Sequence, residues 1–461
     1  MAMEQFIRME RIEINGLKNV CYGVVEFNEY RAIEDGQFQH LQSVLGIYGQ
    51  NGSGKTTVLD ATKILKIILT GGKLPENFNQ MVNNELNHTK LSYTFFIDSQ
   101  RMKQLVTYTF LIEYLDDCYQ LTSEKITSKV YSEEEQKWKS LSTLIECNHK
   151  EIVYKTLAKK LKKQSLIELG VAQDIDHGSS FIFHERNRRI LLDELLSKSK
   201  EENARFIDVL QLLPFYANTC LLIIENDVIG SINLNTFMPI SLYLSDQKRV
   251  SMGNIPVNLL SPNVMPKEVY RDMECVIEQI DAVIHAIIPS LHLRITNQKD
   301  QYLEDGTLGT SFDIVSERNE KFIPLKYESE GIKRLISVIS SMIAAYNHAS
   351  ICLMIDEFDS GIFEYLLGEL VEIIDESAKG QFIFTSHNLR ALEKLSYKSI
   401  IVTTTNPNNR YIQLSGVKSN NNIRDYYYTN ILLGGQEESI YEETKNYKIK
   451  RAFRKAGKMN G

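Results

Sequence analysis

The chain alternates short apolar runs with longer stripes of helical spacing, and this pattern predicts an α/β fold. The runs 44–48, 351–355 and 382–384 are short enough for strands of a parallel sheet that is buried on both faces. A helix is predicted directly after the first run, because apolar residues then recur every three or four positions, at Val58, Ala61, Leu65 and Ile68. Gly71 and Gly72 mark the end of that helix.

Alternating positions in the first third of the chain predict a second, antiparallel sheet. The expected strands span 10–15, 22–27, 91–98 and 105–114, with more short strands to about residue 145. We therefore assign residues 1–150 to an N-terminal lobe in which an antiparallel sheet lies beside the parallel one.

The pattern then becomes mostly helical. The strand-like run 220–224 interrupts the helices expected at 154–166, 189–213 and 266–288. The last of these carries the clearest apolar stripe, at Val269, Met273, Val276, Ile280, Val283 and Ile287. We interpret 151–290 as a compact helical insertion, because long coiled-coil arms need heptads sustained far beyond this length. The stripe is then either core or a groove for a partner.

Residues 291–461 are expected to form a C-terminal lobe. A hairpin is predicted near 293–315, and the last strands are predicted at 399–403 and 411–414.

Composition narrows the class of protein. The 461 residues exceed one ordinary domain, and the net charge of −7 gives no overall basic field that would attract nucleic acid. Six cysteines occur without a C-x-x-C pair, which disfavours a zinc site or a disulfide framework and fits a reducing cytosol. No apolar run reaches about 18 residues and no signal-peptide pattern begins the chain, so we expect a cytoplasmic protein without a membrane span.

The run from Gly49 to Thr56 fits the phosphate-binding loop G-x-x-x-x-G-K-[ST]. Glycines let backbone N–H groups approach phosphate oxygens, and the helix that follows aims its N-terminus at them. Lys55 can reach the outer phosphates of ATP, and the Thr56 hydroxyl can bind Mg²⁺. The predicted nucleotide contacts in this region are Gly49, Asn51, Gly52, Ser53, Gly54, Lys55, Thr56 and Thr57.

Two carboxylates follow the buried run 351–355, at the end of a strand where ligands bind in open α/β sheets. Asp356 is expected to hold Mg²⁺, and Glu357 is expected to activate the attacking water as general base. Taken alone, the pair could equally be a strand cap with two solvated acids.

Two further segments supply candidate contacts to the γ-phosphate. Ser329 can cap an apolar helix at 335–345, and Gly331 permits the close approach of a ligand. His387 follows the run 382–384 and can contact a phosphate through its imidazole. When each segment stands alone, an ordinary capped helix and a surface histidine are the alternative interpretations.

The order of these motifs resembles that of the ATP-binding-cassette (ABC) class: phosphate loop, signature helix, acidic pair, D-loop at Asp359 and switch histidine. Gly331 precedes Asp356 by 25 residues, and His387 follows Glu357 by 30. The opening Ile-Glu-Ile-Asn-Gly-Leu-Lys-Asn at 12–19 and the signature Ser-Glu-Gly-Ile-Lys at 329–333 resemble the RecF/SMC/Rad50 branch. Within that branch the chain looks like the AAA15/OLD-type ATPases of bacterial anti-phage systems, such as the PARIS, Septu and AbiL types.

The resemblance implies an ABC-type ATPase head, with a mixed P-loop sheet, an antiparallel N-lobe sheet and a helical insertion. It also implies ATP hydrolysis with Mg²⁺ at composite sites, in a homodimer or higher homo-oligomer. Lys55, Glu357 and His387 would be catalytic. The signature residues Ser329 and Gly331, with Asp359 of the D-loop, would complete the nucleotide site of the partner.

The resemblance further implies a role as sensor or scaffold in an anti-phage system. The chain would control a separate effector, such as a TOPRIM or HNH nuclease or a toxin, and DNA or a phage protein would be the trigger. Only 74 residues follow His387, too few for a TOPRIM domain in the same chain. The alternatives are a RecF/SMC-like DNA-repair ATPase that binds DNA directly and a nucleotide-gated module without hydrolysis.

Some features lie outside these motifs. Many relatives carry a histidine soon after the D-loop, whereas this chain reads Gly-Ile-Phe-Glu-Tyr at 361–365. The lid glutamine of the family could be either Gln80 or Gln100. The tail 444–461 has seven basic residues and no acid, which suits DNA phosphates, an acidic partner or a solvated terminus. A second basic cluster, with a solvated face as its default interpretation, consists of Lys159, Lys160, Lys162 and Lys163.

Overall fold

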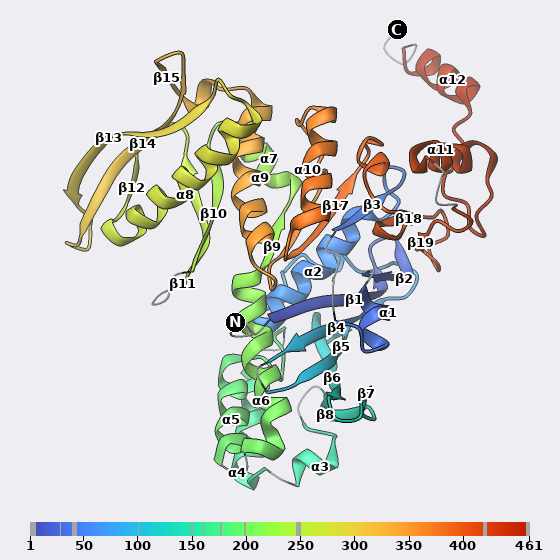
Figure 1. The fold of residues 1–461 in the computed structure, drawn as a ribbon. Coiled ribbons are helices and arrows are strands. Elements are labelled where there is room, and N and C mark those ends of the chain that lie inside the picture. The colour runs from blue at the N-terminus through green and yellow to red at the C-terminus, as the bar shows by residue number, and fades with distance from the viewer. Residues whose placement is uncertain are drawn as a thin grey trace.

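The chain forms a mixed sheet, a larger antiparallel sheet and a peripheral lobe of helices and strands (Figure 1). The predicted α/β class, with a mixed P-loop sheet beside an antiparallel sheet, is confirmed. The computed structural model describes residues 6–27, 29–38, 44–99, 101–148, 151–159, 161–175, 178–197, 200–245, 250–417 and 422–457.

The central sheet gathers strands from both halves of the sequence. Its order is β19–β18–β3–β17–β16–β9, and all neighbours are parallel except β19 and β18. Most of its positions are buried, which explains why the sequence shows short, nearly continuous apolar runs here. The bounds are β3 Val44–Tyr48, β9 Leu221–Ile224, β16 Cys352–Ile355, β17 Gln381–Ser386, β18 Ile400–Thr403 and β19 Tyr411–Gln413.

The antiparallel sheet has the order β2–β1–β4–β5–β6–β7, and β8 also pairs with β6. Helix α2 (Lys55–Leu69) packs against it, where the Tyr93 hydroxyl donates to the Ala61 carbonyl at 2.6 Å. Gln381 of β17 exchanges two hydrogen bonds with the backbone of Met9, at 3.0 and 2.8 Å, which joins the two sheets. The bounds are β1 Phe6–Leu17, β2 Val20–Glu26, β4 His88–Asp98, β5 Lys103–Leu115, β6 Cys118–Ser132, β7 Lys137–Trp138 and β8 Ser142–Asn148, with the short helix α1 Glu29–Glu34 after β2.

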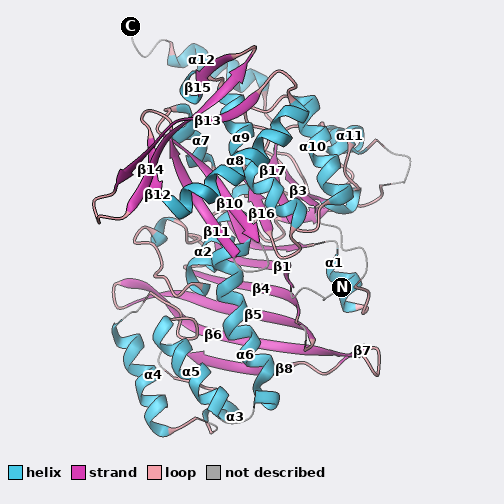
Figure 2. Cartoon of the chain, turned by 60° about the vertical axis from the view of Figure 1, so that its left-hand side comes forward, coloured by secondary structure: helices cyan, strands magenta, loops and turns pink. Residues whose placement is uncertain are grey.

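Four helices follow and lie beside the antiparallel sheet (Figure 2): α3 Lys155–Ala158, α4 Lys163–Ile175, α5 Glu185–Ser197 and α6 Lys200–Phe215. The single helices predicted at 154–166 and 189–213 are therefore wrong in extent, because each range spans two helices. The Asn203 side chain of α6 donates to the Leu195 carbonyl near the end of α5 at 3.2 Å, which links the two helices. The buried Glu124 of β6 holds this segment on the sheet by accepting from Ser180 Oγ at 2.6 Å and from the Phe181 N–H at 2.5 Å.

The peripheral lobe combines helix α8 (Lys267–Ile287) with two small sheets. The predicted stripe of α8 is core, since Met273, Val276 and Ile280 are buried. Three of the strands lie inside the range 151–290 that the sequence pattern marked as mostly helical, and the division of the chain into three domains stays a prediction. The remaining bounds are α7 Asn226–Asn233, β10 Phe237–Ser245, β11 Val250–Asn258, β12 Asn263–Pro266, β13 His292–Tyr302, β14 Leu308–Arg318 and β15 Lys321–Pro324.

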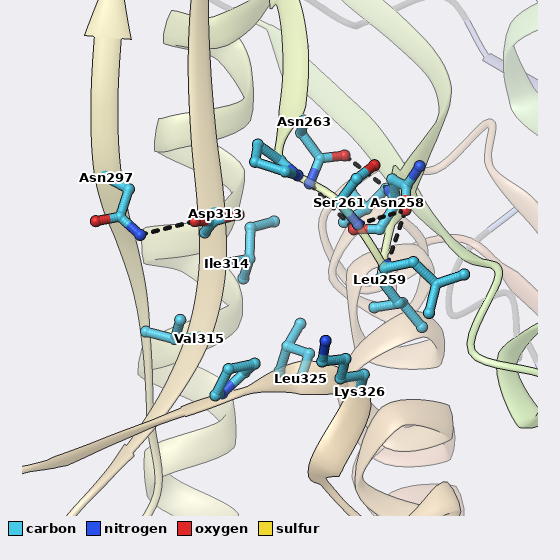
Figure 3. A pocket seen from close by; sticks show the side chains of 14 residues that line it. Asn258, Leu259, Ser261, Asn263, Asn297, Asp313, Ile314, Val315, Leu325 and Lys326 are labelled. Carbon is cyan, nitrogen blue, oxygen red and sulfur yellow. Dashed lines mark hydrogen bonds between the residues drawn. The ribbon is translucent and has the colours of Figure 1, made fainter.

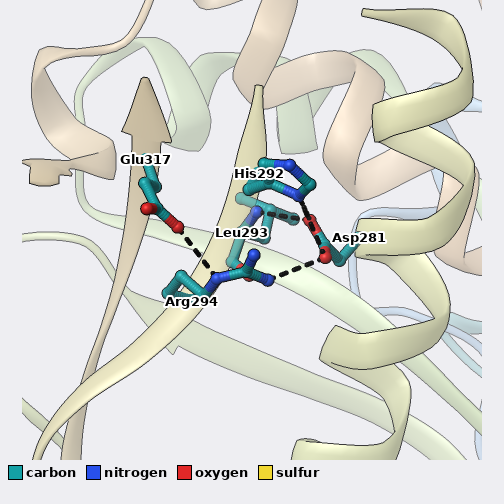
Figure 4. Close-up of polar contacts among 5 residues, drawn as sticks. All are labelled: Asp281, His292, Leu293, Arg294 and Glu317. Carbon is teal, nitrogen blue, oxygen red and sulfur yellow. Dashed lines mark hydrogen bonds and ion pairs between the residues drawn. The ribbon is translucent and has the colours of Figure 1, made fainter. Parts of the chain in front are cut away.

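Asp281 fixes α8 onto β13 and β14 through a cluster of polar contacts (Figure 4). Its carboxylate accepts from the Leu293 N–H at 2.8 Å and from Arg294 Nη1 at 2.8 Å, and it lies 3.2 Å from His292 Nδ1. Arg294 continues the cluster to Glu317, with Nε and Oε2 2.9 Å apart. These contacts hold α8 against β13 and β14 within the lobe.

That helix, α9 (Glu330–Asn347), connects the lobe to the central sheet. Ser241 of β10 contacts it twice, through its N–H to Ser340 Oγ at 3.0 Å and through its hydroxyl to Ser341 Oγ at 2.5 Å. The last helices are α10 Glu364–Ser377, α11 Ile423–Leu433 and α12 Asn446–Ala456. Among the described residues, no helix combines the length and apolar character needed to cross a membrane.

Candidate functional site

The predicted phosphate loop lies between β3 and α2, at the carboxyl end of a central strand. Gly52 and Gly54 have φ values of 74° and 99°, which side chains rarely tolerate, and Gly54 directly precedes α2. Gly49 needs to be glycine for space, since a Cβ there would lie 1.7 Å from Thr403 Oγ1. The glycines of the motif are therefore required by this backbone, and the N-terminus of α2 is open to an anion.

Lys55 begins α2 and is buried, with its side chain folded back into the loop. The ammonium donates to the Gly49 carbonyl at 2.9 Å and to the Gln50 carbonyl at 3.1 Å. Burial lowers the pKa of Lys55, and the nearby carboxylates, Asp356 foremost, oppose this shift. A cation held in the loop beside these carbonyls suits the recognition of phosphate oxygens.

The other loop residues divide into two groups. Asn51 and Gly52 are exposed at the tip of the loop, whereas the Ser53 hydroxyl contacts Thr403 Oγ1 at 2.5 Å inside it. Thr57 is buried, and its hydroxyl lies 3.5 Å from Asn19 Oδ1. Its place among the nucleotide contacts stays a prediction.

Thr56 and Asp356 place hard oxygen donors side by side. The Thr56 hydroxyl lies 3.3 and 3.2 Å from the two carboxylate oxygens, and Thr385 of β17 donates to the same carboxylate at 2.6 Å. Mg²⁺ prefers oxygen ligands and is commonly held by one or two protein oxygens together with substrate phosphates and water. The donor set fits that ion.

Glu357 has a left-handed backbone conformation, with φ 46°, which is uncommon for a residue with a side chain. Its N–H donates to Thr385 Oγ1 at 2.8 Å. Arg334 of α9 donates from Nη2 to the Asp356 carbonyl at 3.4 Å. Burial lowers the pKa of Arg334 to about 10, against the attraction of the two carboxylates. Neither Thr385 nor Arg334 was predicted from the sequence as a site residue.

The signature and the D-loop lie against each other in the same chain. Ser329 is exposed, and its hydroxyl accepts from the Ile332 N–H at 3.3 Å, which confirms the predicted cap of α9. A Cβ on Gly331 would lie 2.4 Å from the Gly361 carbonyl oxygen, so the two backbones are in direct contact. Large aromatic side chains beside them are exposed: Tyr327 (72%), Phe363 (75%) and Tyr365 (56%).

His387 follows β17 directly, and its backbone N–H donates to the Asp359 carboxylate at 3.3 and 3.4 Å. Burial and the Lys55 ammonium lower the pKa of His387, against the pull of Asp359 and the acidic pair. The lowered pKa favours the neutral imidazole, which can donate one hydrogen bond to a phosphate oxygen. The lid glutamine stays unassigned. Gln80 lies in a 3₁₀ turn (Phe78–Gln80), and Gln100 lies outside the described residues. Lys160 and Lys458 of the two basic clusters also lie outside the described residues.

Further residues support the phosphate loop from outside it. The Asn19 side chain donates to the Gly52 carbonyl, and the Tyr411 hydroxyl donates to the Gly54 carbonyl at 2.7 Å. Arg410 reaches the Asn19 carbonyl at 2.7 Å. Asn19 is the last residue of the opening motif 12–19, which carries the family resemblance, so its part in the site could have been predicted from that motif. Arg410 and Tyr411 have no comparable signal in the sequence.

A strap formed by residues 436–442 packs beside the loop. Glu442 and Gln50 exchange two contacts, from the Glu442 N–H to Gln50 Oε1 at 3.0 Å and from Gln50 Nε2 to the Glu442 carbonyl at 3.5 Å. Ile440 is buried, and the Ser439 carbonyl accepts from the Thr405 N–H at 2.8 Å. The strap thus joins the C-terminal segment to the phosphate loop.

A cavity of about 250 Å³ lies elsewhere, in the peripheral lobe between the segment 257–263, which joins β11 to β12, β14 and the turn Leu325–Tyr327 (Figure 3). Its most prominent polar groups are already engaged in local structure. Asn263 Oδ1 accepts from the Asn258 N–H at 2.7 Å, and Asn297 donates to Asp313 at 2.8 Å. The convergent charged groups lie at the phosphate loop, which is therefore the candidate functional site.

The sequence profile of the AAA domain matches residues 14–229, a span that includes the phosphate loop, most of the antiparallel sheet and β9. This match supports a nucleotide-binding ATPase domain in the N-terminal half of the chain. A search of curated proteins found no match to the sequence.

Several solved structures align with most of the chain at low identity. An Smc head bound to the C-winged helix domain of ScpA is 13% identical, with 88% of this chain and 98% of that chain covered at a TM-score of 0.40. The SMC head domain from Thermotoga maritima is 12% identical, with coverages of 88% and 99% and a TM-score of 0.35. The recombination mediator RecF with ATP is 11% identical, with coverages of 83% and 94% and a TM-score of 0.33. At these values the similarity carries no argument about function.

Proposed function

We propose that this protein binds ATP with Mg²⁺ and hydrolyses it at sites shared between two copies of the chain. The observation that carries the proposal is the convergence of Lys55, Thr56 and Asp356, with Glu357 next in the chain, at the ends of β3 and β16. Lys55 would bind the outer phosphates, and Thr56 with Asp356 would hold Mg²⁺, whose charge stabilises the transferring phosphoryl group when bound. Glu357 would take the proton from the attacking water.

The second copy is proposed because the signature is exposed. Ser329 and Gly331 begin a helix of 18 residues whose N-terminus is a second anion site, and exposed aromatic side chains flank it. Each charge-assisted hydrogen bond to a phosphate contributes about 1.5–3 kcal/mol. Several such bonds, made only when the γ-phosphate is present, reach the ~5.5 kcal/mol that shifts an open–closed equilibrium fully. ATP would then hold two chains together, and hydrolysis would release them.

As the biological role, we propose a sensor or scaffold of an anti-phage system that controls a separate nuclease or toxin. This proposal rests on the resemblance of the motifs to AAA15/OLD-type ATPases, and the effector and trigger follow from the same resemblance. A gene for a TOPRIM, HNH or toxin protein next to this one, and that protein copurifying with the chain, would support the role.

A second candidate is an ATPase that binds DNA directly, and helix α12 favours it. No side chain of α12 is buried, and the helix projects from the rest of the chain (Figure 1). The 18 residues from Thr444 carry seven of the 52 basic residues and none of the 59 acids, so the remainder has a net charge of −14. DNA binding that weakens steeply with salt, and that is lost on replacing Lys450, Arg451 and Arg454 by glutamine, would favour this candidate.

The ATPase proposal is tested by Glu357→Gln. Removal of the general base is expected to lower turnover by about 10²–10⁴-fold while ATP binding is retained. Size-exclusion chromatography with light scattering, with and without MgATP, should then show a dimer that accumulates only with ATP. No phosphate release by the unsubstituted protein, or a Glu357→Gln protein that stays monomeric in saturating ATP, would count against the proposal.

A further inference from the structure

Arg334 is an unusual residue for its position. It lies on α9 five residues after Ser329, is 2% exposed, and brings a guanidinium next to the two acids of the site. Its Nε and Nη1 atoms are buried without a hydrogen-bond partner among the described residues, and Nη2 makes one long hydrogen bond to the Asp356 carbonyl, at 3.4 Å. A buried cation with unused donors is costly, so the side chain is poorly explained by packing alone.

The acceptor of that bond is informative. The Asp356 carbonyl belongs to the peptide unit that joins Asp356 to Glu357, and the N–H of the same unit donates to Thr385 Oγ1 at 2.8 Å. One peptide is thus contacted on its oxygen by the signature helix and on its nitrogen by β17. The orientation of this peptide determines φ of Glu357, which is held at 46°.

We infer that Arg334 is a positioning residue that couples the signature helix to the general base, by holding the Asp356–Glu357 peptide in the orientation that directs the Glu357 carboxylate. The inference rests on the proposed ATPase function. A shift of α9 when Ser329 and Gly331 engage the nucleotide of a partner would move Arg334, and through the Asp356 carbonyl it would turn Glu357. Arg334 itself touches no substrate in this scheme.

The neighbouring lysine supplies a matched control. Lys333 is buried to the same extent as Arg334 and precedes it on α9, but its ammonium contacts Asn235 Oδ1, in the loop before β10. Replacement of Lys333 by methionine therefore removes a buried cation from the same helical turn without touching the Asp356–Glu357 peptide. Arg334→Met removes the contact to the Asp356 carbonyl, whereas Lys333→Met removes the contact to Asn235.

The experiment compares steady-state ATP hydrolysis by the full chain with Arg334→Met, Arg334→Lys, Thr385→Val and Lys333→Met. Arg334→Met is expected to lower kcat on the order of 10- to 100-fold with ATP affinity retained, since a small misplacement of a catalytic group has effects of this size. Arg334→Lys should recover part of the rate, and Lys333→Met, which lies in the signature run 329–333, should lose less of the rate than Arg334→Met. Thr385→Val, which also removes a donor to the Asp356 carboxylate, should lower kcat at least as far as Arg334→Met.

A double variant separates positioning from general support of the fold. Because Arg334 is inferred to act through Glu357, Arg334→Met in the Glu357→Gln background should cost no further turnover. An Arg334→Met protein with unchanged kcat, or with ATP binding lost together with turnover, would overturn the inference. If Arg334→Met does not fold, as seen by thermal unfolding, Arg334→Lys decides by the same criteria. Absence of turnover in the unsubstituted protein would instead remove the proposed function, and this inference with it.

Discussion

The phosphate-loop side and the signature side of this molecule differ in how complete they are. On the first, Lys55 is folded into its loop, Thr56 faces Asp356, and Asn19 and Tyr411 support the backbone from outside. On the second, Ser329 is exposed, and the contact of Gly331 is with the D-loop of its own chain. The contacts of the phosphate-loop side are made within the chain, whereas the signature side is exposed. We therefore expect the two sides to respond differently to substitution.

The largest effect on ATP binding is expected on the phosphate-loop side. Lys55→Ala removes the cation of the phosphate loop, and we expect ATP affinity to fall on the order of 100-fold, which corresponds to about 3 kcal/mol. Lys66→Ala is the control, because it removes a partly buried lysine near the other end of α2, where Nζ donates to the Leu221 carbonyl. Isothermal titration with MgATP measures both. Equal losses in the two variants would mean that the effect arises from the fold and not from the loop.

On the exposed side we expect a smaller effect of a different kind. A Cβ at residue 331 would lie 2.4 Å from the Gly361 carbonyl oxygen, so Gly331→Ala should displace the signature from the D-loop. Turnover is expected to fall on the order of 10-fold, as for misplaced catalytic geometry, with ATP affinity of the single chain unchanged. Gly230→Ala, in α7 with open space around the new Cβ, is the control. Weaker ATP binding by Gly331→Ala would contradict the separation of the two sides.

Mixing these variants sharpens the comparison. Lys55→Ala keeps a normal signature, and Gly331→Ala keeps a normal phosphate loop, so a mixed dimer should contain one intact composite site. An equimolar mixture should recover about a quarter of the full rate if subunits of a two-fold dimer exchange at random. Hydrolysis that stays at the summed rate of the separate variants would exclude sites shared between chains.

The smallest expected effect is on pH dependence. Burial and Lys55 lower the pKa of His387, so between its shifted pKa and the ordinary imidazole value of about 6.5 the unfolded chain binds more protons here than the folded protein. The free energy of unfolding should therefore be unaffected by this group above about pH 6.5 and should decrease as the pH falls below it. Thermal unfolding without nucleotide at pH 8 and pH 5.5 should show a smaller pH loss for His387→Asn. An equal loss in both proteins would mean that the shift is absent.

The strands and the loop of the phosphate-loop side could be predicted from the sequence because their signals are local. The glycines, Lys55 and Thr56 lie in one short run, and apolar runs mark β3, β16 and β17 as buried strands. The contacts that orient the acids were missed because they depend on tertiary proximity. Thr385 reaches Asp356 from 29 residues away and Arg334 from 22, and neither spacing follows a helical or strand period.

The peripheral lobe was predicted less well for another reason. Strand β10 carries a clear alternation, with Met238, Ile240 and Leu242 buried, but it contains Pro239, which weakens a strand signal. The inward residues of β10 pack on α9, and this contact cannot be seen before the fold is known. The proline is accommodated because β10 pairs with β11 alone in a two-stranded sheet.

The strap 436–442 has a practical consequence for work on this protein. Because the Glu442 N–H donates to the Gln50 side chain, the segment that leads into α12 is tethered to the phosphate loop. In a chain whose exposed Cys118 and Cys275 are replaced by serine, a fluorophore on Phe453→Cys, at a side chain that is 76% exposed, is therefore expected to report nucleotide binding from outside the site.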